Sequence, residues 1–207
     1  MTLACLVDVY NTLVAVDFNG HDRTLAGLAG VDLGTWTRAR EQVQVISGTG
    51  QATRAEMYDI TLRTCGVKPR EELVRELVAT DLDMLLAHAR LFDDALPFLD
   101  RLRSRQIAIA LVSNCGAHTR PMLVSLGLID LVDVTVLSCE VGMLKPAPRI
   151  FRHALSELGV AAADALFVDD QAAFCAGAQT TGISAIQIVR NGNLPDGAVR
   201  SLLDALG

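Results

Sequence analysis

Three short apolar runs in this chain stop abruptly at polar side chains, and this pattern restricts the possible folds more than any other feature. The runs cover residues 3–7, 107–112 and 165–168. The polar residues that follow them are Asp8, the pair Ser113 and Asn114, and the pair Asp169 and Asp170. Runs this short are typical of strands buried on both faces. Because helical patterns alternate with the strand patterns, the sequence predicts an α/β fold with a doubly wound parallel sheet.

The polar strand ends predict a binding site. Strands of a parallel sheet end at one shared edge, which is where open α/β folds bind ligands. A single aspartate such as Asp8 can equally cap a turn, but three polar endings favour a shared crevice. Lys145, in the loop after a further strand at 132–137, could reach the same edge.

The charge of this crevice points to a cation. Asp8, Asp169 and Asp170 would raise each other's pKa unless positive charge lay nearby, and Lys145 offsets only one of them. Mg²⁺ prefers carboxylate and water oxygens, so we expect it here. Together with hydroxyl and amide donors, such a site suits a phosphoryl group, which a carboxylate could attack.

A helical segment interrupts the strand pattern. No strand pattern appears between residues 21 and 90, and Thr53 with Glu56 has the spacing of a capping box that opens a helix. We therefore predict a core domain over residues 1–14 and 92–207 and an all-helical domain over residues 15–91. A short helix is also expected at 197–206.

Composition narrows the classes of partner and compartment. The net charge of −6 argues against nucleic acid or an anionic membrane as the main partner. We expect no signal peptide or membrane span, and the five scattered cysteines predict a reduced, cytoplasmic protein. The four histidines show no ligand spacing and are expected on the surface or in helix packing. Oligomeric state leaves no signal in the sequence.

Four segments resemble, in order, the motifs of the haloacid dehalogenase (HAD) superfamily of hydrolases. They are Asp8-Val9-Tyr10-Asn11-Thr12-Leu13, Ser113-Asn114, Lys145-Pro146-Ala147-Pro148 and Phe167-Val168-Asp169-Asp170. The helical segment after the first motif is similar to the mobile cap of one subgroup. The resemblance implies a Rossmann-like core, a helical cap and hydrolysis of a small-molecule substrate.

The resemblance also implies roles for the residues of these motifs. Asp8 would be the nucleophile, and Ser113 and Lys145 would bind the transferring group. Asn114 would support them, and Thr12 would position the first loop. Asp8, Asp169 and Asp170 would hold Mg²⁺ through their carboxylates, with the backbone carbonyl of residue 10 as a further ligand.

Two features of the motifs point to different subgroups of this superfamily. Tyr10 stands where family phosphatases have an aspartate that serves as general acid and base. A phenol with a pKa near ~10 is a poor base at neutral pH but can donate a proton, and losing the acid lowers rates by roughly 10²–10⁴-fold. Tyrosine here is similar to the 2-haloacid dehalogenases, which need no metal. Those enzymes, however, lack the acidic pair that this chain has at Asp169 and Asp170.

Three functions follow from these features. The leading hypothesis is a Mg²⁺-dependent phosphatase of a small phosphorylated metabolite, acting through an aspartyl-phosphate on Asp8. The first alternative is a metal-independent hydrolase of the 2-haloacid dehalogenase type, in which Arg38 or Arg40 of the cap would hold a substrate carboxylate. Those arginines can equally belong to a solvated helix face. The second alternative is a binding protein that keeps the pocket but has lost efficient turnover.

Overall fold

The computed structural model describes residues 2–206, so Met1 and Gly207, at the ends of the predicted core domain, lie outside the described residues. Its larger part is built on a five-stranded sheet with the strand order β5-β4-β1-β6-β7, in which all neighbours are parallel. The strands are β1 (Ala4–Val7), β4 (Ala108–Ser113), β5 (Val134–Leu137), β6 (Ala165–Asp169) and β7 (Ser184–Gln187). The predicted α/β fold is confirmed. Because β1 pairs with β4 and β6, Asp8 leaves the sheet between the ends of those two strands.

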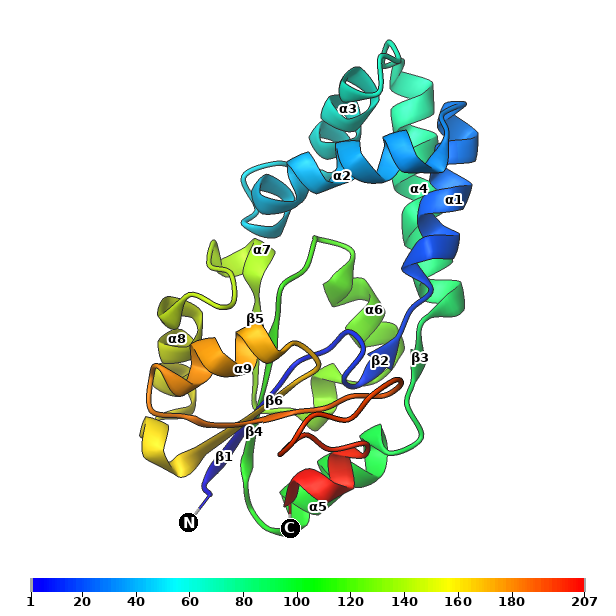
Figure 1. The fold of residues 1–207 in the computed structure, drawn as a ribbon. Helices are drawn as coiled ribbons and strands as arrows, with labels where there is room; N and C mark the ends of the chain where they lie inside the picture. Colours follow the sequence, from blue (N-terminus) through cyan, green and yellow to red (C-terminus); the bar gives the residue numbers. More distant parts are fainter. Residues whose placement is uncertain (1, 207) are drawn as a thin grey trace.

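Helices cover both faces of this sheet (Figure 1). One face packs against α5 (Ala95–Ser104) and α6 (Thr119–Ser125), and the other against α8 (Pro148–Leu158) and α9 (Ala172–Gln179). Alternate residues of each strand face opposite layers: Val7 packs with Phe98 and Leu99, whereas Leu6 packs with Phe151 and Phe167. The continuous apolar runs follow from this burial on both faces.

Four helices form a separate layer above the carboxyl edge of the sheet (Figure 1), which we call the helical insertion. They are α1 (Phe18–Ala29), α2 (Leu33–Gly48), α3 (Arg54–Thr64) and α4 (Glu71–His88). The insertion has its own apolar core around Trp36, Tyr58 and Leu77. The predicted capping box opens α3: the Glu56 amide donates to Thr53 Oγ1 at 3.2 Å, and the Thr53 amide donates to Glu56 Oε2 at 2.8 Å.

A two-stranded antiparallel ribbon joins the insertion to the core. It pairs β2 (Val14–Ala15) with β3 (Arg90–Leu91). Two residues are too few to show alternation, so the sequence gives no sign of these strands. The ribbon lies at the boundaries expected between the two domains.

The C-terminal prediction was wrong. In place of a helix over 197–206, a short 3₁₀ helix covers only Leu202–Leu206. Gly197 has a φ of +76°, which a helix cannot accommodate. The Leu202 amide donates to Asp94 Oδ2 at 2.9 Å, so a carboxylate from a distant segment fixes where the 3₁₀ helix begins. A four-residue helix that was not predicted, α7 (Ser138–Val141), follows β5.

Two expectations from composition can be compared with the structure. All five cysteines are free thiols. No helix within residues 2–206 is long and apolar enough to cross a membrane.

Candidate active site

A buried lysine joins two carboxylates at the carboxyl edge of the sheet. Lys145 Nζ donates to Asp8 Oδ1 and to Asp169 Oδ2, both at 2.6 Å. Asp169 is fully buried, and Lys145 is 3% exposed. Backbone hydrogen bonds hold the carboxylates in place: the Asp8 amide donates to the Val168 carbonyl at 2.9 Å, and the Gln171 amide donates to Asp169 Oδ1 at 2.8 Å. The structure therefore brings together three of the predicted site residues.

Asn114 holds the backbone of this lysine. Its Nδ2 donates to the Lys145 carbonyl at 2.8 Å, and its Oδ1 accepts from the Lys145 amide at 2.7 Å. Ser113 Oγ, next to Asn114 in sequence, and Thr12 Oγ1, in the loop after Asp8, are buried and have no hydrogen-bond partner among the described residues. An unpartnered buried hydroxyl is costly unless a ligand satisfies it, so Ser113 at the end of β4 fits a site for an anion.

Asp170 completes a group of three carboxylates. One carboxylate oxygen each of Asp8, Asp169 and Asp170 lies within 4.8 Å of the others. Asp170 is half-buried, and its Oδ2 accepts from Asn11 Nδ2 at 3.3 Å. Gln187 Nε2 donates to the Asp170 carbonyl at 2.8 Å, which fixes the backbone from β7. Sequence reasoning assigned no role to Asn11 or Gln187.

The electrostatics of this group favour an additional cation. Burial and the charge of Asp8 raise the pKa of Asp169 to about 7. The same two causes raise the pKa of Asp170. Burial alone would lower the pKa of Lys145, but Asp8 and Asp169 outweigh it and raise that pKa, so the lysine stays charged. One ammonium offsets one of three carboxylates, and the clustered oxygens fit a divalent ion such as Mg²⁺.

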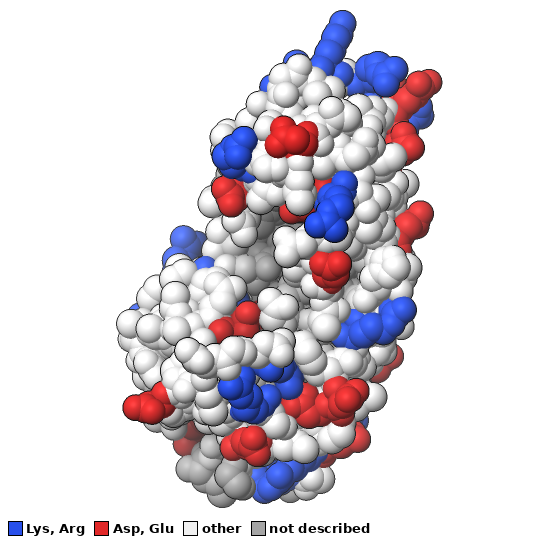
Figure 2. All heavy atoms as spheres, turned by 45° about the vertical axis from the view of Figure 1, so that its right-hand side comes forward, with Lys and Arg blue, Asp and Glu red and all other residues white. Residues whose placement is uncertain are grey.

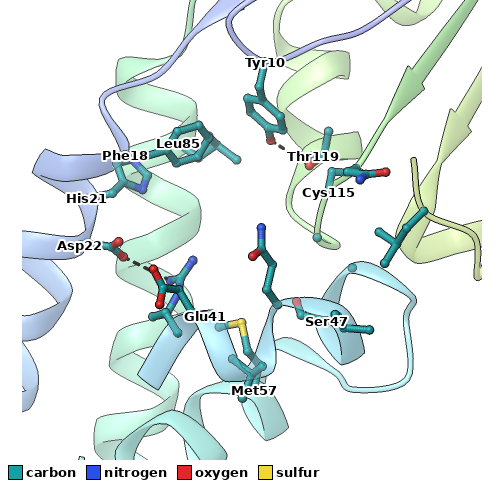
Figure 3. A pocket seen from close by; sticks show the side chains of 18 of the residues that line it. Tyr10, Phe18, His21, Asp22, Glu41, Ser47, Met57, Leu85, Cys115 and Thr119 are labelled. Carbon is teal, nitrogen blue, oxygen red and sulfur yellow. Dashed lines mark hydrogen bonds and ion pairs between the residues drawn. The ribbon is translucent and has the colours of Figure 1, made fainter. Parts of the chain in front are cut away.

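Tyr10 faces the cavity above this site. Its hydroxyl lies 2.8 Å from Thr119 Oγ1, and its ring packs edge-on against Phe18 with centroids 5.2 Å apart (Figure 3). Burial raises the pKa of Tyr10, so the phenol keeps its proton at neutral pH. It can donate a hydrogen bond or a proton, but it cannot act as a general base under those conditions.

A cavity of about 580 Å³ separates the sheet edge from the helical insertion. In the space-filling view the surface is hollowed where the two meet, and acidic and basic side chains are interspersed around the opening (Figure 2). The core lines the cavity with Asp8, Tyr10, Asn114 and Lys145, among others. From the insertion, Glu41, Ser47 and Met57 point into it (Figure 3). Asp169, Asp170, Ser113 and Thr12 lie outside this lining.

The two candidate arginines of the insertion lie in different places. Arg40 lines the cavity, where its Nη1 donates to the Tyr58 hydroxyl at 3.3 Å and lies 3.7 Å from Asp22 Oδ1. Arg38 is exposed, and its guanidinium donates to Thr35 on its own helix. Two residues along a helix are about 200° apart, so both cannot face the cavity. The structure does not bring Arg38 to the site.

A cluster of ionisable residues in the cavity wall was missed by sequence reasoning. Asp81 on α4 is only 4% exposed, and Arg54 Nε lies 3.0 Å from its Oδ2. His118 Nδ1 lies 3.2 Å and His21 Nδ1 lies 3.6 Å from its carboxylate oxygens. Both histidines are buried, so of the two expected positions, surface or helix packing, neither occupies the surface. A signal was present, since Asp81 continues the apolar stripe of Leu73 and Leu77 at four-residue spacing.

Comparisons with known proteins identify the family. Residues 2–180 match the family model of the haloacid dehalogenase-like hydrolases, and the chain belongs to this family of enzymes. It is similar to Phosphatase MT3486 of Mycobacterium tuberculosis (strain CDC 1551 / Oshkosh), with 37% identity covering 81% of this chain and 86% of that protein.

Other relatives are dehalogenases. The (S)-2-haloacid dehalogenase 4A of Burkholderia cepacia is 26% identical, covering 93% of this chain and 85% of that protein. The crystal structure of 2-haloacid dehalogenase from Pseudomonas syringae pv. Tomato DC3000 superposes with a TM-score of 0.76 at 22% identity, covering 100% of this chain and 98% of that one. This structural likeness shows the fold alone. The comparisons thus include both phosphatases and dehalogenases.

Proposed function

We propose that this hydrolase is a Mg²⁺-dependent phosphatase of a small phosphorylated metabolite that forms an aspartyl-phosphate on Asp8. The observation that carries the proposal is the group of three carboxylates within 4.8 Å, of which the single lysine can offset only one. Carboxylates this close together repel one another unless a cation lies among them. The similarity to a phosphatase over most of both chains supports the same conclusion.

The reaction would use the residues at the sheet edge. The Asp8 carboxylate attacks phosphorus, the bond to the leaving oxygen breaks, and the alcohol departs with a proton from the Tyr10 hydroxyl or from water. Lys145 and Ser113 bind phosphoryl oxygens, and Asn114 keeps Lys145 in place. Mg²⁺ held by Asp8, Asp169 and Asp170 would neutralise phosphoryl charge. Water then attacks the phosphorus of the aspartyl-phosphate, which releases phosphate and restores Asp8, and the proton that this water loses replaces the one given to the alcohol.

We further propose that the helical insertion acts as the cap of this enzyme, with the domain boundaries near residues 14/15 and 91/92. The β2–β3 ribbon at those positions and the cavity between the two parts support this division. A cytoplasmic location is also proposed, because free thiols are typical of reducing compartments.

A panel of phosphomonoesters tests the proposal directly. Phosphate release should require Mg²⁺, cease with EDTA and return when Mg²⁺ is restored. Asp170→Asn should raise the Mg²⁺ concentration that gives half-maximal rate, because it removes one proposed ligand. Absence of metal-dependent turnover across the panel would contradict the proposal.

Dehalogenation is a second candidate because of two observations. Tyr10 occupies the position of the phosphatase acid, and Lys145 bridges Asp8 and Asp169 directly. In that reaction the Asp8 carboxylate displaces a halide from carbon, and the halide needs no proton. Chloride release from 2-chloropropionate that persists in EDTA would favour this candidate. Tight ligand binding without conversion of either substrate class would instead indicate a binding protein.

A further inference from the structure

Arg54 is a cation that the helical insertion supplies to the cavity. It stands in the first turn of α3 and lines the cavity with 16% of its side chain exposed. Its Nε lies against Asp81, and its Nη1 contacts the Met57 sulfur at 3.4 Å. No described residue accepts a hydrogen bond from its Nη2. Arg40, in contrast, is already engaged by Tyr58 and Asp22. Arg54 therefore has donors available to a ligand.

Asp81 fixes where this guanidinium lies. Among residues 2–206 it is the one buried carboxylate outside the sheet edge, where the others are Asp8 and Asp169. His21 from α1 and His118 from the core also face it, so the carboxylate is held from two domains. The contacts are ion pairs by distance, and both Arg54 Nε and Asp81 Oδ2 lack a hydrogen bond of good geometry. Asp81 therefore holds the Arg54 guanidinium in place without satisfying all of its hydrogen-bond donors.

Gly116 lets the guanidinium reach the core. A Cβ atom at Gly116 would lie 3.0 Å from Arg54 Nη1 and 3.4 Å from Nη2, so the arginine rests against this glycine. Gly116 is two residues after Asn114, which holds Lys145. Two residues of extended chain span at most about 7 Å. Arg54 and Gly116 therefore line the same cavity as Asp8 and Lys145.

We propose that Arg54, positioned by Asp81, binds a second oxyanion of the substrate, a carboxylate or phosphate a few bonds from the group that Asp8 attacks. A planar guanidinium matches the paired oxygens of such groups, and the Nη2 of Arg54 has no acceptor among the described residues. The inference rests on the proposed function, because it assumes that the substrate reacts at Asp8. It restricts the phosphorylated metabolite to one that carries another acidic group.

Binding of non-hydrolysable probes tests this inference. Phosphonoacetate carries the second acid, and ethylphosphonate is a matched phosphonate that lacks it. Isothermal titration calorimetry with Mg²⁺ present should show phosphonoacetate binding about 10- to 100-fold more tightly. Arg54→Gln should bring this ratio close to one, and Arg63→Gln, an exposed arginine on the same helix, should preserve it. Ethane-1,2-bisphosphonate distinguishes the sources, since a greater gain for it would identify phosphate as the second group.

Two further variants test whether the position of Arg54, and not only its presence, determines the preference for a second acid. Gly116→Ala keeps Arg54 and has no φ restriction, yet its methyl group would displace the guanidinium, so the ratio should fall. Asp81→Asn should raise KM for phosphoglycolate more than for ethyl phosphate, because Asp81 acts through Arg54 and touches neither substrate.

The two proposals fail in different ways. If the wild-type protein binds both phosphonates equally, or if Arg54→Gln leaves the ratio unchanged, the role of Arg54 is overturned and the phosphatase proposal survives. If the wild-type protein binds neither phosphonate and hydrolyses no phosphomonoester, the proposed function falls, and the role of Arg54 falls with it.

Discussion

The two walls of the cavity are built in different ways. At the sheet edge, Asp8, Asn114 and Asp169 lie at or directly after the ends of paired strands, so the pairing of the strands fixes where they emerge. In the helical wall, Arg54 and Asp81 come from different helices, and their meeting depends on how α3 packs against α4. The chemistry of the first wall can be predicted from local sequence. The second wall depends on tertiary packing.

Asp8→Asn should have the largest effect. The amide is a poor nucleophile, so kcat should fall by at least about 10³-fold while the fold persists. Asp164→Asn, at the opposite edge of the sheet, is a matched control that should retain activity. Steady-state kinetics with circular dichroism melting of each variant would check this. Comparable kcat values for the two variants would contradict the proposal that Asp8 is the nucleophile.

Lys145→Met should reduce stability more than any other single change at the sheet edge. It leaves Asp8 and Asp169 without their buried partner, which costs about 3–5 kcal/mol of unfolding free energy at neutral pH. Mg²⁺ should restore part of this loss, since it would offset the same carboxylates. Urea unfolding with and without Mg²⁺ measures both effects. Arg152→Met, at an exposed position on α8, should change stability by less than about 0.5 kcal/mol.

Asp81→Asn tests the helical wall by its pH dependence. Burial would raise the pKa of Asp81, but His118, His21 and Arg54 outweigh it and lower that pKa. The stabilisation is therefore complete above the unfolded pKa near ~3.9 and is lost progressively as pH falls from there through the lower pKa of the folded state. We expect the variant to be about 3 kcal/mol less stable at pH 7, with a smaller difference at pH 3.

Urea unfolding at both pH values measures this difference between Asp81→Asn and the wild-type protein. Asp59→Asn, which removes an exposed ion pair on α3, provides the control. A difference that is the same at pH 3 and pH 7 would show that the carboxylate charge of Asp81 does not stabilise the wall.

Thr53→Ala should have the smallest effect and should act only on the insertion. Removing this N-cap is expected to cost about 1 kcal/mol of unfolding free energy. Thr64→Ala, at the exposed C-terminal end of the same helix, should be nearly neutral. Hydrogen exchange would show whether the loss is confined to α1–α4. Equal loosening of the sheet would mean that the two walls unfold as one unit.

The sequence predicted the strands of the central sheet more completely than the ribbon and the C-terminal 3₁₀ helix. The runs that end at Asp8, Ser113 and Asp169 were recognisable because burial on both faces leaves an uninterrupted apolar pattern. The capping box at Thr53 was equally local. The ribbon β2–β3 was too short to leave a pattern, and the start of the C-terminal 3₁₀ helix depends on Asp94, a residue more than a hundred positions earlier.

Within the candidate site, the residues at the strand ends could be predicted from the sequence, whereas those on the helices could not. Asp8, Lys145, Asn114 and Asp169 were predicted as neighbours because a parallel sheet must bring its strand ends together. Arg38 and Arg40 were chosen by residue type alone, and helix geometry separated them. Asp81 was overlooked because its significance arises only when His118 from the core lies against it.

Because β1 lies at the centre of the sheet, the site around Asp8 cannot form during synthesis until the strands on both sides of β1 have been made. Ala4 pairs with Ala108 on one side and Ala165 on the other, so the first strand leaves the ribosome long before either neighbour. Such distant pairing is slow, whereas the insertion, whose helices pack on one another, can fold from local contacts. We therefore expect α1–α4 to be structured on the nascent chain before the strands on either side of Asp8 have both emerged.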